Sequence, residues 1–551
     1  MNNYNQDRLE KLDRDYKIFA KNTVYSFMYI YSGFFLSLIT SFLIARMISK
    51  ELWGFLLIAL SLIALFQTFL IFLPPSLGLS INYFIPRYYA LKENKKLKNF
   101  LIYSITLRIL FILLIFTISL ISFYFLPVIY KTSLKNYTHL FLILSPLIII
   151  NGLNLVFYDV NRSLNFFKTV FYLLVLNYLI QICGLIFYIL ISNTFQVEII
   201  ALIILFSYLI PFLFNCIIIF YLLKFKIKVD KEEEGIKIKG FLKKLYGYGS
   251  HLSVQDFLVN FIKQFRVQTI GFLDSSESVL GYNIGNNYNH VVFEGISSFN
   301  RPLTVSFSKL DITEERYKIV RIYNVSLHYA VFLILLISGV LFFIVDFFLF
   351  IVYGESFLKY SLLLKLMVIS IIFNIMTPFF FSLLRSSQKY KKIIPISLII
   401  SLIRIILFLT GLIFFGLYGA IILGALIADT IISFFSVILS FKFFKIQLNV
   451  IKACIQYLIF FISIGAVILL NELILEDINL LILRTLNIKI LKYLEYFPIF
   501  FFIIIYLSLN IILKVFSNID LQYLKAFFDK DEKSHRFVRK MIKLAEKVIR
   551  K

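Results

Sequence analysis

Apolar runs of about 20 residues recur along the whole chain and alternate with short stretches rich in charged and polar residues. A helix of that length crosses the hydrocarbon core of a bilayer. Backbone polar groups find no water in lipid, so runs this long and apolar predict helices rather than strands. We therefore predict an all-α polytopic membrane protein with about fourteen transmembrane helices. These helices are expected near residues 23–46, 53–73, 101–126, 138–158, 170–192, 199–223, 248–271, 279–300, 322–345, 358–383, 394–415, 418–441, 452–471 and 495–514.

Basic residues outnumber acidic ones, and they are unevenly placed between the predicted helices. The chain has 56 Lys and Arg against 31 Asp and Glu, a formal net charge of +25. If the N-terminus is cytoplasmic, most basic residues fall in the leader 1–22, the cytoplasmic loops and the tail 515–551, as the positive-inside rule requires. We therefore predict a multi-pass cell-membrane protein with both termini cytoplasmic. Orientation and contact with anionic lipids explain the positive charge, so nucleic acid is not an expected partner.

Two basic segments separate the predicted helices into groups. A charge-mixed cytoplasmic linker at 224–247 divides six spans in 23–223 from six in 248–441, and residues 442–514 hold two further spans. The tail 515–551 places apolar side chains on one helical face and basic side chains elsewhere. That pattern predicts an amphipathic helix lying in the membrane interface, with a solvated helical tail as the alternative.

A short polar turn occurs at the same place in both six-helix groups. The turn within Ala45–Phe55 ends in a glycine followed by an aromatic residue, and so does the turn within Gly271–Tyr282. Because each group has an even number of helices, the two copies enter the membrane in the same direction. We therefore predict two six-helix lobes related by a pseudo-twofold axis, plus two extra C-terminal helices, which is the geometry of a two-lobed transporter.

Basic side chains interrupt several of the apolar runs. A charge within a membrane helix is by default a candidate for function. Arg46 and Arg301 lie near span ends, where a long side chain can also reach the interface. Arg87 follows the second span and is either a cytoplasmic gate residue or an anchor that fixes topology. Three others are isolated on apolar helices and are expected to pair locally or to reach the interface: Arg108, Lys365 and Arg404.

The seventh predicted span carries a polar stripe. Ser253, Asp256, Asn260 and Lys263 recur at helical spacing and share one face, with Arg266 beside it. Such a stripe is not expected to face lipid. Lys263 and Arg266 are suited to bind a phosphate, and the Asn260 amide is suited to bind sugar hydroxyls. The alternative is that these groups only form hydrogen bonds between helices.

The eighth predicted span has a polar face of its own. It includes Asn287, Glu294 and Arg301, with Tyr288 available to stack on a sugar ring. Acidic residues within spans are rarer than basic ones, and Asp256, Glu294 and Asp429 are the candidates. Each acid is predicted either to pair with a nearby cation or to bind the H⁺ or Na⁺ that drives transport.

Enzymatic chemistry finds little support in the sequence. The chain has no Walker motif, and its acidic residues show no catalytic or metal-ligand spacing with a histidine. The three cysteines fall within apolar segments without ligand-like spacing. No cofactor is therefore expected apart from a coupling ion.

Five motifs lie at boundaries of the predicted helices. They are Arg46–Gly54 with Arg87–Ala90, Asp274–Tyr282, Arg301–Leu303, Tyr353–Phe357 and Gly416–Ala420. In this order they resemble the polysaccharide (O-antigen type) flippases of the multidrug/oligosaccharidyl-lipid/polysaccharide exporter (MOP) superfamily. The resemblance covers about residues 20–440. Asp429 departs from it, because the family usually has a small or apolar residue there.

The resemblance implies the flipping of a lipid-linked oligosaccharide from the inner to the outer leaflet through a central cavity. Its implied partners are a polyprenyl-phosphate-linked glycan, membrane lipids and glycan-assembly enzymes, and a monomer is expected. Two alternatives stay open within the superfamily: a lipid II-type flippase and a multidrug or toxin cation antiporter. The excess of cations over acids in the polar spans favours an anionic ligand.

Overall fold

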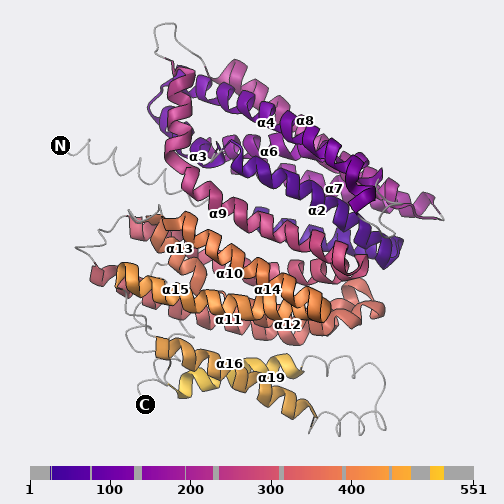
Figure 1. Ribbon diagram of the computed structural model, residues 1–551, viewed down its shortest axis with the longest axis vertical. Coiled ribbons are helices and arrows are strands. Elements are labelled where there is room, and N and C mark those ends of the chain that lie inside the picture. The colour runs from indigo at the N-terminus through magenta and orange to yellow at the C-terminus, as the bar shows by residue number, and fades with distance from the viewer. Residues whose placement is uncertain are drawn as a thin grey trace, which may run out of the picture. The chain divides into compact units, whose positions relative to one another are not determined.

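Helices make up all the regular structure that the described part of the chain contains (Figure 1). The computed structural model describes residue 25, residues 28–74, 77–129, 139–192, 194–227, 235–308, 316–386, 392–445, 450–472 and 497–513, and residue 515. The prediction of an all-α membrane protein is confirmed. The predicted leader 1–22 and nearly all of the tail 515–551 lie outside the described residues.

The described residues form two compact units, each with its own set of helices. The first contains the residues up to Asn283 together with Ile393–Leu402. Its helices are Met28–Met47, α2 (Lys50–Phe72), α3 (Leu77–Ala90), α4 (Asn94–Ile129), α5 (His139–Leu144), α6 (Pro146–Ser163), α7 (Phe167–Ile191), α8 (Val197–Tyr221), its π-helical continuation η2 (Leu222–Lys226) and α9 (Ile238–Leu273).

The second unit contains residues from Ile284 onward except Ile393–Leu402. The boundary between the units falls within α10. The limits of the two six-helix lobes that the sequence predicts stay a prediction. The second unit takes α10 (Ser276–Ser308) from Ile284 onward and α14 (Ile393–Ile421) from Ile403 onward. Its other helices are α11 (Arg316–Tyr353), η3 (Glu355–Tyr360), α12 (Ser361–Ile372), α13 (Met376–Ser386), η5 (Ile422–Ile427), α15 (Ala428–Phe444), α16 (Val450–Leu470) and α19 (Phe497–Ile512).

Within the first unit, α2 packs along α9. The Ser61 hydroxyl donates to Oε1 of Gln264 at 2.8 Å, and Nε2 of Gln268 donates to the Ile58 carbonyl at 2.9 Å. At the start of α2, Gly54 lies against the main chain of Ser276, so any Cβ at that position would collide with it. The glycine that ends the first repeated turn is therefore needed for close approach of two backbones.

The helix count agrees with the prediction in part. Nine described helices are long and apolar enough to span a membrane, and the bent pair Glu355–Ile372 and Met376–Arg385 would make ten. The helices α9 and α10 have 36 and 33 residues, but they are too polar to pass that test. These helices contain the two polar spans that the sequence predicted. The exact number of fourteen remains a prediction.

The 42° bend between α12 and α13 breaks a predicted span. A break frees main-chain carbonyls that lipid cannot satisfy. Here the Tyr457 hydroxyl of α16 donates to the Ile372 carbonyl at 2.8 Å, and the Ser433 hydroxyl of α15 donates to the Phe373 carbonyl. Side chains from two neighbouring helices therefore satisfy the interruption.

The 52 consecutive helical residues Ile393–Phe444 cannot be one span. A straight helix of this length would measure about 78 Å, more than twice the hydrocarbon thickness. Gly416 interrupts it with φ 66° and ψ −158°, and the residues on either side pack back on each other. Gly411 lies against the main chain of Gly419, and Gly424 lies against Phe408. The chain thus reverses at Gly416, within the motif that resembles a family turn.

An ion pair joins the two arms of this hairpin. Nε and Nη2 of Arg404 both donate to Oδ1 of Asp429, at 3.1 and 2.7 Å. The two side chains are only 17% and 13% exposed. Because both charges are largely removed from solvent, each depends on the other for compensation.

The backbone of Gly416 lies in a region open to glycine alone, so Gly416→Ala should strain the turn. We expect a loss of about 1–3 kcal/mol of stability, measured as a lower midpoint of thermal unfolding in detergent. Gly465→Ala is the matched control, because nothing lies within 4 Å of a Cβ placed there. Equal midpoints for the two variants would contradict this account of the reversal.

Removing one partner of the Arg404–Asp429 pair should destabilise the protein more than removing both. Arg404→Leu or Asp429→Leu leaves an uncompensated charge in a largely buried site, at a cost of up to about 3–5 kcal/mol. The double variant should recover much of that loss. The measurement is a double-mutant cycle of unfolding midpoints, and purely additive effects would show that the pair is not coupled.

Candidate functional site

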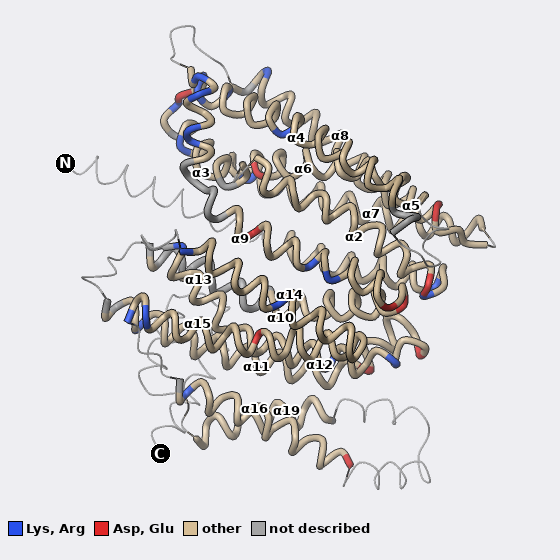
Figure 2. The backbone as a smooth tube through the Cα atoms, viewed as in Figure 1, with Lys and Arg blue, Asp and Glu red and all other residues tan. Residues whose placement is uncertain are grey.

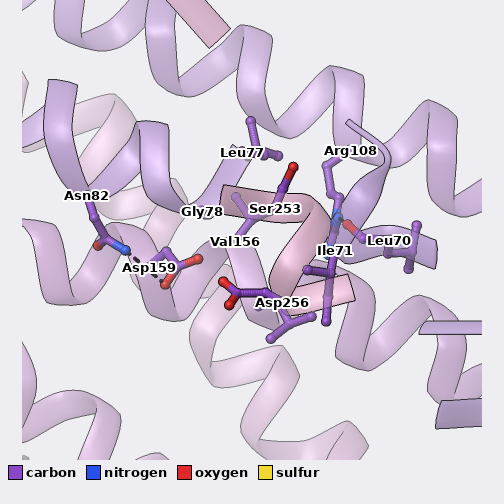
Figure 3. A pocket seen from close by; sticks show the side chains of 11 residues that line it. Leu70, Ile71, Leu77, Gly78, Asn82, Arg108, Val156, Asp159, Ser253 and Asp256 are labelled. Carbon is purple, nitrogen blue, oxygen red and sulfur yellow. Dashed lines mark hydrogen bonds between the residues drawn. The ribbon is translucent and has the colours of Figure 1, made fainter. Parts of the chain in front are cut away.

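A cavity of about 210 Å³ lies among five helices of the first unit (Figure 3). The helices α2, α3 and α6 supply its apolar lining, whereas polar side chains come from α3, α4, α6 and α9. The volume is that of several water molecules, at about 30 Å³ each. The polar lining residues are Asn82, Arg108, Asp159, Ser253 and Asp256.

Arg108 of α4 is held by main-chain oxygens at the edge of this cavity. Its Nε donates to the Gly152 carbonyl at 3.0 Å, and its Nη1 donates to the Leu70 carbonyl near the end of α2. Residue 74, whose N–H would ordinarily bind the Leu70 carbonyl, is a proline and has no N–H. Arg108 therefore caps the end of α2. Its predicted local pairing is confirmed.

Asp159 and Asp256 are the two carboxylates that line the cavity, from α6 and α9. Nδ2 of Asn82 on α3 lies 3.4 Å from Oδ1 of Asp159, close enough to donate a weak hydrogen bond. A Cβ at Gly78 would collide with Oδ2 of Asp159, so the glycine leaves room for the carboxylate. The arrangement places two acids beside a space large enough for a hydrated cation.

The predicted polar stripe on α9 divides between different surroundings. Ser253 and Asp256 line the cavity, and Nδ2 of Asn260 donates to the Asp256 carbonyl of its own helix at 2.8 Å. Lys263 is exposed, and none of the ion pairs among the described residues includes it. Arg266 is half-buried. Only the first half of the stripe therefore contributes to the cavity.

On α10, the described side chains differ in their exposure. Asn287 is exposed. Tyr288 is buried, its hydroxyl donates to the Leu341 carbonyl at 2.6 Å, and its ring lies 4.7 Å from that of Phe348. The prediction that Tyr288 stacks on a sugar is wrong in this conformation, because packing against α11 occupies the ring. The side chains of Glu294 and Arg301 lie outside the described residues.

The other predicted charges that the structure describes lie near helix ends or in ion pairs. Arg46 is exposed and lies over the Phe42 ring at 4.3 Å, and Arg87 is exposed in the last turn of α3. Lys365 pairs with Asp346 at 2.6 Å. Together with the pair formed by Arg404, this contact confirms the predicted local pairing of Lys365 and Arg404.

Sequence reasoning missed two acids, Asp159 and Asp346. The predicted fourth span ended at 158 and the ninth at 345, one residue before each acid, whereas α6 continues to Ser163 and α11 to Tyr353. The signal was present in the sequence. Each acid lies four or more residues before its helix ends, so extending the helical spacing past the apolar run would have included both.

Comparisons with known proteins agree with this architecture. The profile of a family described as polysaccharide biosynthesis protein matches residues 19–307. No curated protein sequence matches the chain. Among solved structures, an inward-facing multidrug resistance MATE family transporter of the MOP superfamily matches with a TM-score of 0.56 and 13% identity, covering 74% of this chain and 94% of that one.

Two further structures of the same kind match. A MOP superfamily transporter from Pyrococcus furiosus has a TM-score of 0.53 and 14% identity, covering 78% of this chain and 96% of its own. The lipid II flippase MurJ, in an inward closed conformation, has a TM-score of 0.53 and 16% identity, covering 89% of this chain and 99% of its own. Identities this low show a shared fold alone. Because the family match spans more than half of the 551 residues, the chain belongs to the polysaccharide biosynthesis protein family, and its fold is that of the MOP superfamily transporters.

Proposed function

We propose that this protein flips a lipid-linked oligosaccharide, carried on a polyprenyl phosphate or diphosphate, from the inner to the outer leaflet. Membership of the polysaccharide biosynthesis family supports a glycan substrate. A fold shared with membrane transporters supports alternating access as the mechanism. In such a cycle the isoprenoid chain stays in lipid while the charged head group crosses, so the protein must supply a cationic path.

The contrast between Lys263 and the other intramembrane cations carries this proposal. Arg108, Lys365 and Arg404 are each held by carbonyls or by an acid. Lys263 is exposed on α9 and takes part in no ion pair among the described residues. A lysine kept within a membrane helix without such compensation is costly unless a ligand or water meets it. The phosphate of the substrate is the ligand that fits.

Other predicted residues complete the proposed substrate path. Arg266, one turn beyond Lys263, adds a planar fork of donors suited to a phosphate. Arg46 and Arg301 are proposed to assist at the ends of the path, and Arg87 is proposed as a cytoplasmic gate. The amides that we propose for sugar hydroxyls are those of Asn260 and Asn287.

We infer that the acidic cavity of the first unit binds the coupling ion. Asp159 and Asp256 offer carboxylate oxygens, which suit Na⁺ or H⁺ better than an anionic substrate. Glu294 remains a second candidate, whereas Asp429 is engaged by Arg404. A membrane potential supplies a further driving force of about 2.3 kcal/mol per charge per 100 mV for outward movement of an anionic head group.

A lipid II-type flippase is the second candidate function. MurJ covers 89% of this chain, whereas the MATE transporter covers 74%. This difference favours a flippase with helices beyond the first twelve. A multidrug or toxin cation antiporter is less favoured, because an exposed lysine would repel a cationic drug.

Lys263→Ala should lower flipping of a fluorescent polyprenyl-diphosphate disaccharide in proteoliposomes about tenfold or more, because a charged hydrogen bond contributes about 1.5–3 kcal/mol. Lys263→Arg should retain most of the rate. Lys168→Ala, which removes an exposed lysine at the start of α7, controls for net charge. Unimpaired flipping by a well-expressed Lys263→Ala protein would remove the support for a cationic path.

Asp256→Asn should abolish the response of flipping to an imposed Na⁺ or pH gradient, because the amide can neither bind a proton nor offer a charge to Na⁺. Asp159→Asn should act in the same way. Asp346→Asn, outside the cavity, should keep the response. The measurement compares initial rates with and without each gradient. A gradient response that survives in both cavity variants would contradict the coupling role.

A further inference from the structure

The first turns of α9 form a surface that the proposed transport does not use. They run across the ends of α3 and α4, and the helix then bends into the direction of its longer part (Figure 1). We call the outward side of this segment the α9 basic face. It consists of Lys239, Lys243, Tyr246 and Ile238.

The inward side of the segment is fixed to the first unit by apolar packing. Phe241 and Leu245 are 1% and 0% exposed and belong to one core cluster with Leu97 and Phe100 of α4. The rings of Phe100 and Phe241 meet edge to face, with centroids 5.0 Å apart. Burying two large side chains this completely anchors the segment.

Polar contacts hold the same segment in one orientation about its helix axis. Nζ of Lys244 donates to the Tyr88 hydroxyl at 2.7 Å and lies 5.6 Å from the centre of the Phe84 ring. Nδ2 of Asn99 lies 3.5 Å from the Ile236 carbonyl, just before the helix starts. Lys244 is therefore held against α3, whereas Lys239 and Lys243 are exposed.

The α9 basic face combines charge with exposed apolar surface. Lys239, Lys243 and Tyr246 follow helical spacing and are exposed, and Ile238 is 59% exposed. Residues 235–246 contain four lysines and no acid, although the sequence has three glutamates at 232–234, outside the described residues. Basic residues gather at this end of the first unit (Figure 2).

We propose that the α9 basic face binds the head-group phosphates of anionic phospholipids in the inner leaflet. A helical segment with lysines beside exposed apolar and aromatic side chains is suited to lie in the membrane interface. The tyrosine ring fits the head-group level, and lysine stems lie along apolar surface while their charges reach phosphate. A soluble anion would satisfy the lysines but would leave Ile238 in water, whereas a bilayer accommodates both.

This proposal does not depend on which substrate is transported. It concerns the side of the membrane that the sequence predicts to be cytoplasmic, where anionic lipids attract basic segments. The two parts of α9 also pack differently: the segment before the bend contacts α3 and α4, whereas the longer part packs along α2.

The test uses Tyr246→Trp in full-length protein reconstituted into vesicles. Trp53 is the chain's one tryptophan and is 4% exposed, so the wild-type protein supplies the background. Quenching is compared between brominated phosphatidylglycerol and brominated phosphatidylcholine at low salt. We expect preferential quenching by phosphatidylglycerol, because each lysine near an anionic surface contributes roughly a fivefold preference. The preference should fall as salt is added.

Charge-reversal variants distinguish lipid binding by the α9 basic face from attraction of anionic lipids to the protein's net positive charge. In the Tyr246→Trp background, Lys239→Glu with Lys243→Glu should abolish the preference, whereas Lys239→Arg with Lys243→Arg should keep it. Lys168→Glu, at an exposed lysine on the side also predicted to be cytoplasmic, should leave it unchanged. Ile238→Trp is a second reporter if Tyr246→Trp fails to fold.

Three results would overturn the proposal. Equal quenching by the two lipids would show that the face does not select charge. A preference that survives the double glutamate variant would place the selection elsewhere. If brominated undecaprenyl phosphate in phosphatidylcholine quenches more strongly than phosphatidylglycerol at equal charge, the face captures the transported lipid instead. None of these results bears on the proposed transport, which is tested separately by the flipping rate of Lys263→Ala.

Discussion

A charged or polar group in hydrocarbon needs a partner, and that constraint accounts for much of what the described helices show. Arg108 fills the place of an N–H that a proline lacks, and Arg404 joins the two arms of the hairpin at Gly416. Lys365 lies against an acid of α11. These three cations already have partners, whereas Lys263 is exposed and belongs to no ion pair among the described residues.

The two proposed binding regions of the first unit have opposite charge. The cavity among α2, α3, α4, α6 and α9 presents two carboxylates, whereas the later turns of α9 present an exposed lysine. The polar stripe of α9 therefore has an acidic residue, Asp256, toward one end and a basic residue, Lys263, about two turns further along. Sites separated in this way can hold a cation and an anion at the same time, so the proposed coupling ion and the proposed head group would not compete for one site.

Much of the architecture followed from the sequence, because lipid allows few alternatives to an apolar helix. The two polar spans were also predictable, since polar residues at helical spacing mark a face turned away from lipid. The cavity was not predictable, because it combines residues from distant helices. Asp159 was missed because the predicted fourth span ended one residue before it. The burial of Tyr288 depends on Phe348, a neighbour that sequence spacing does not identify.

The hydroxyl contact from α16 at the break between α12 and α13 gives this C-terminal helix a structural role in the preceding part of the chain. The Ile372 oxygen receives its hydrogen bond from Tyr457, and the Phe373 ring stacks on the same tyrosine. A chain shortened to end after α15 would lose that donor. The interrupted helix would then have to straighten, or the Ile372 oxygen would lack its hydrogen bond in hydrocarbon. The geometry of the tenth predicted span therefore depends partly on a residue more than eighty positions further along the chain.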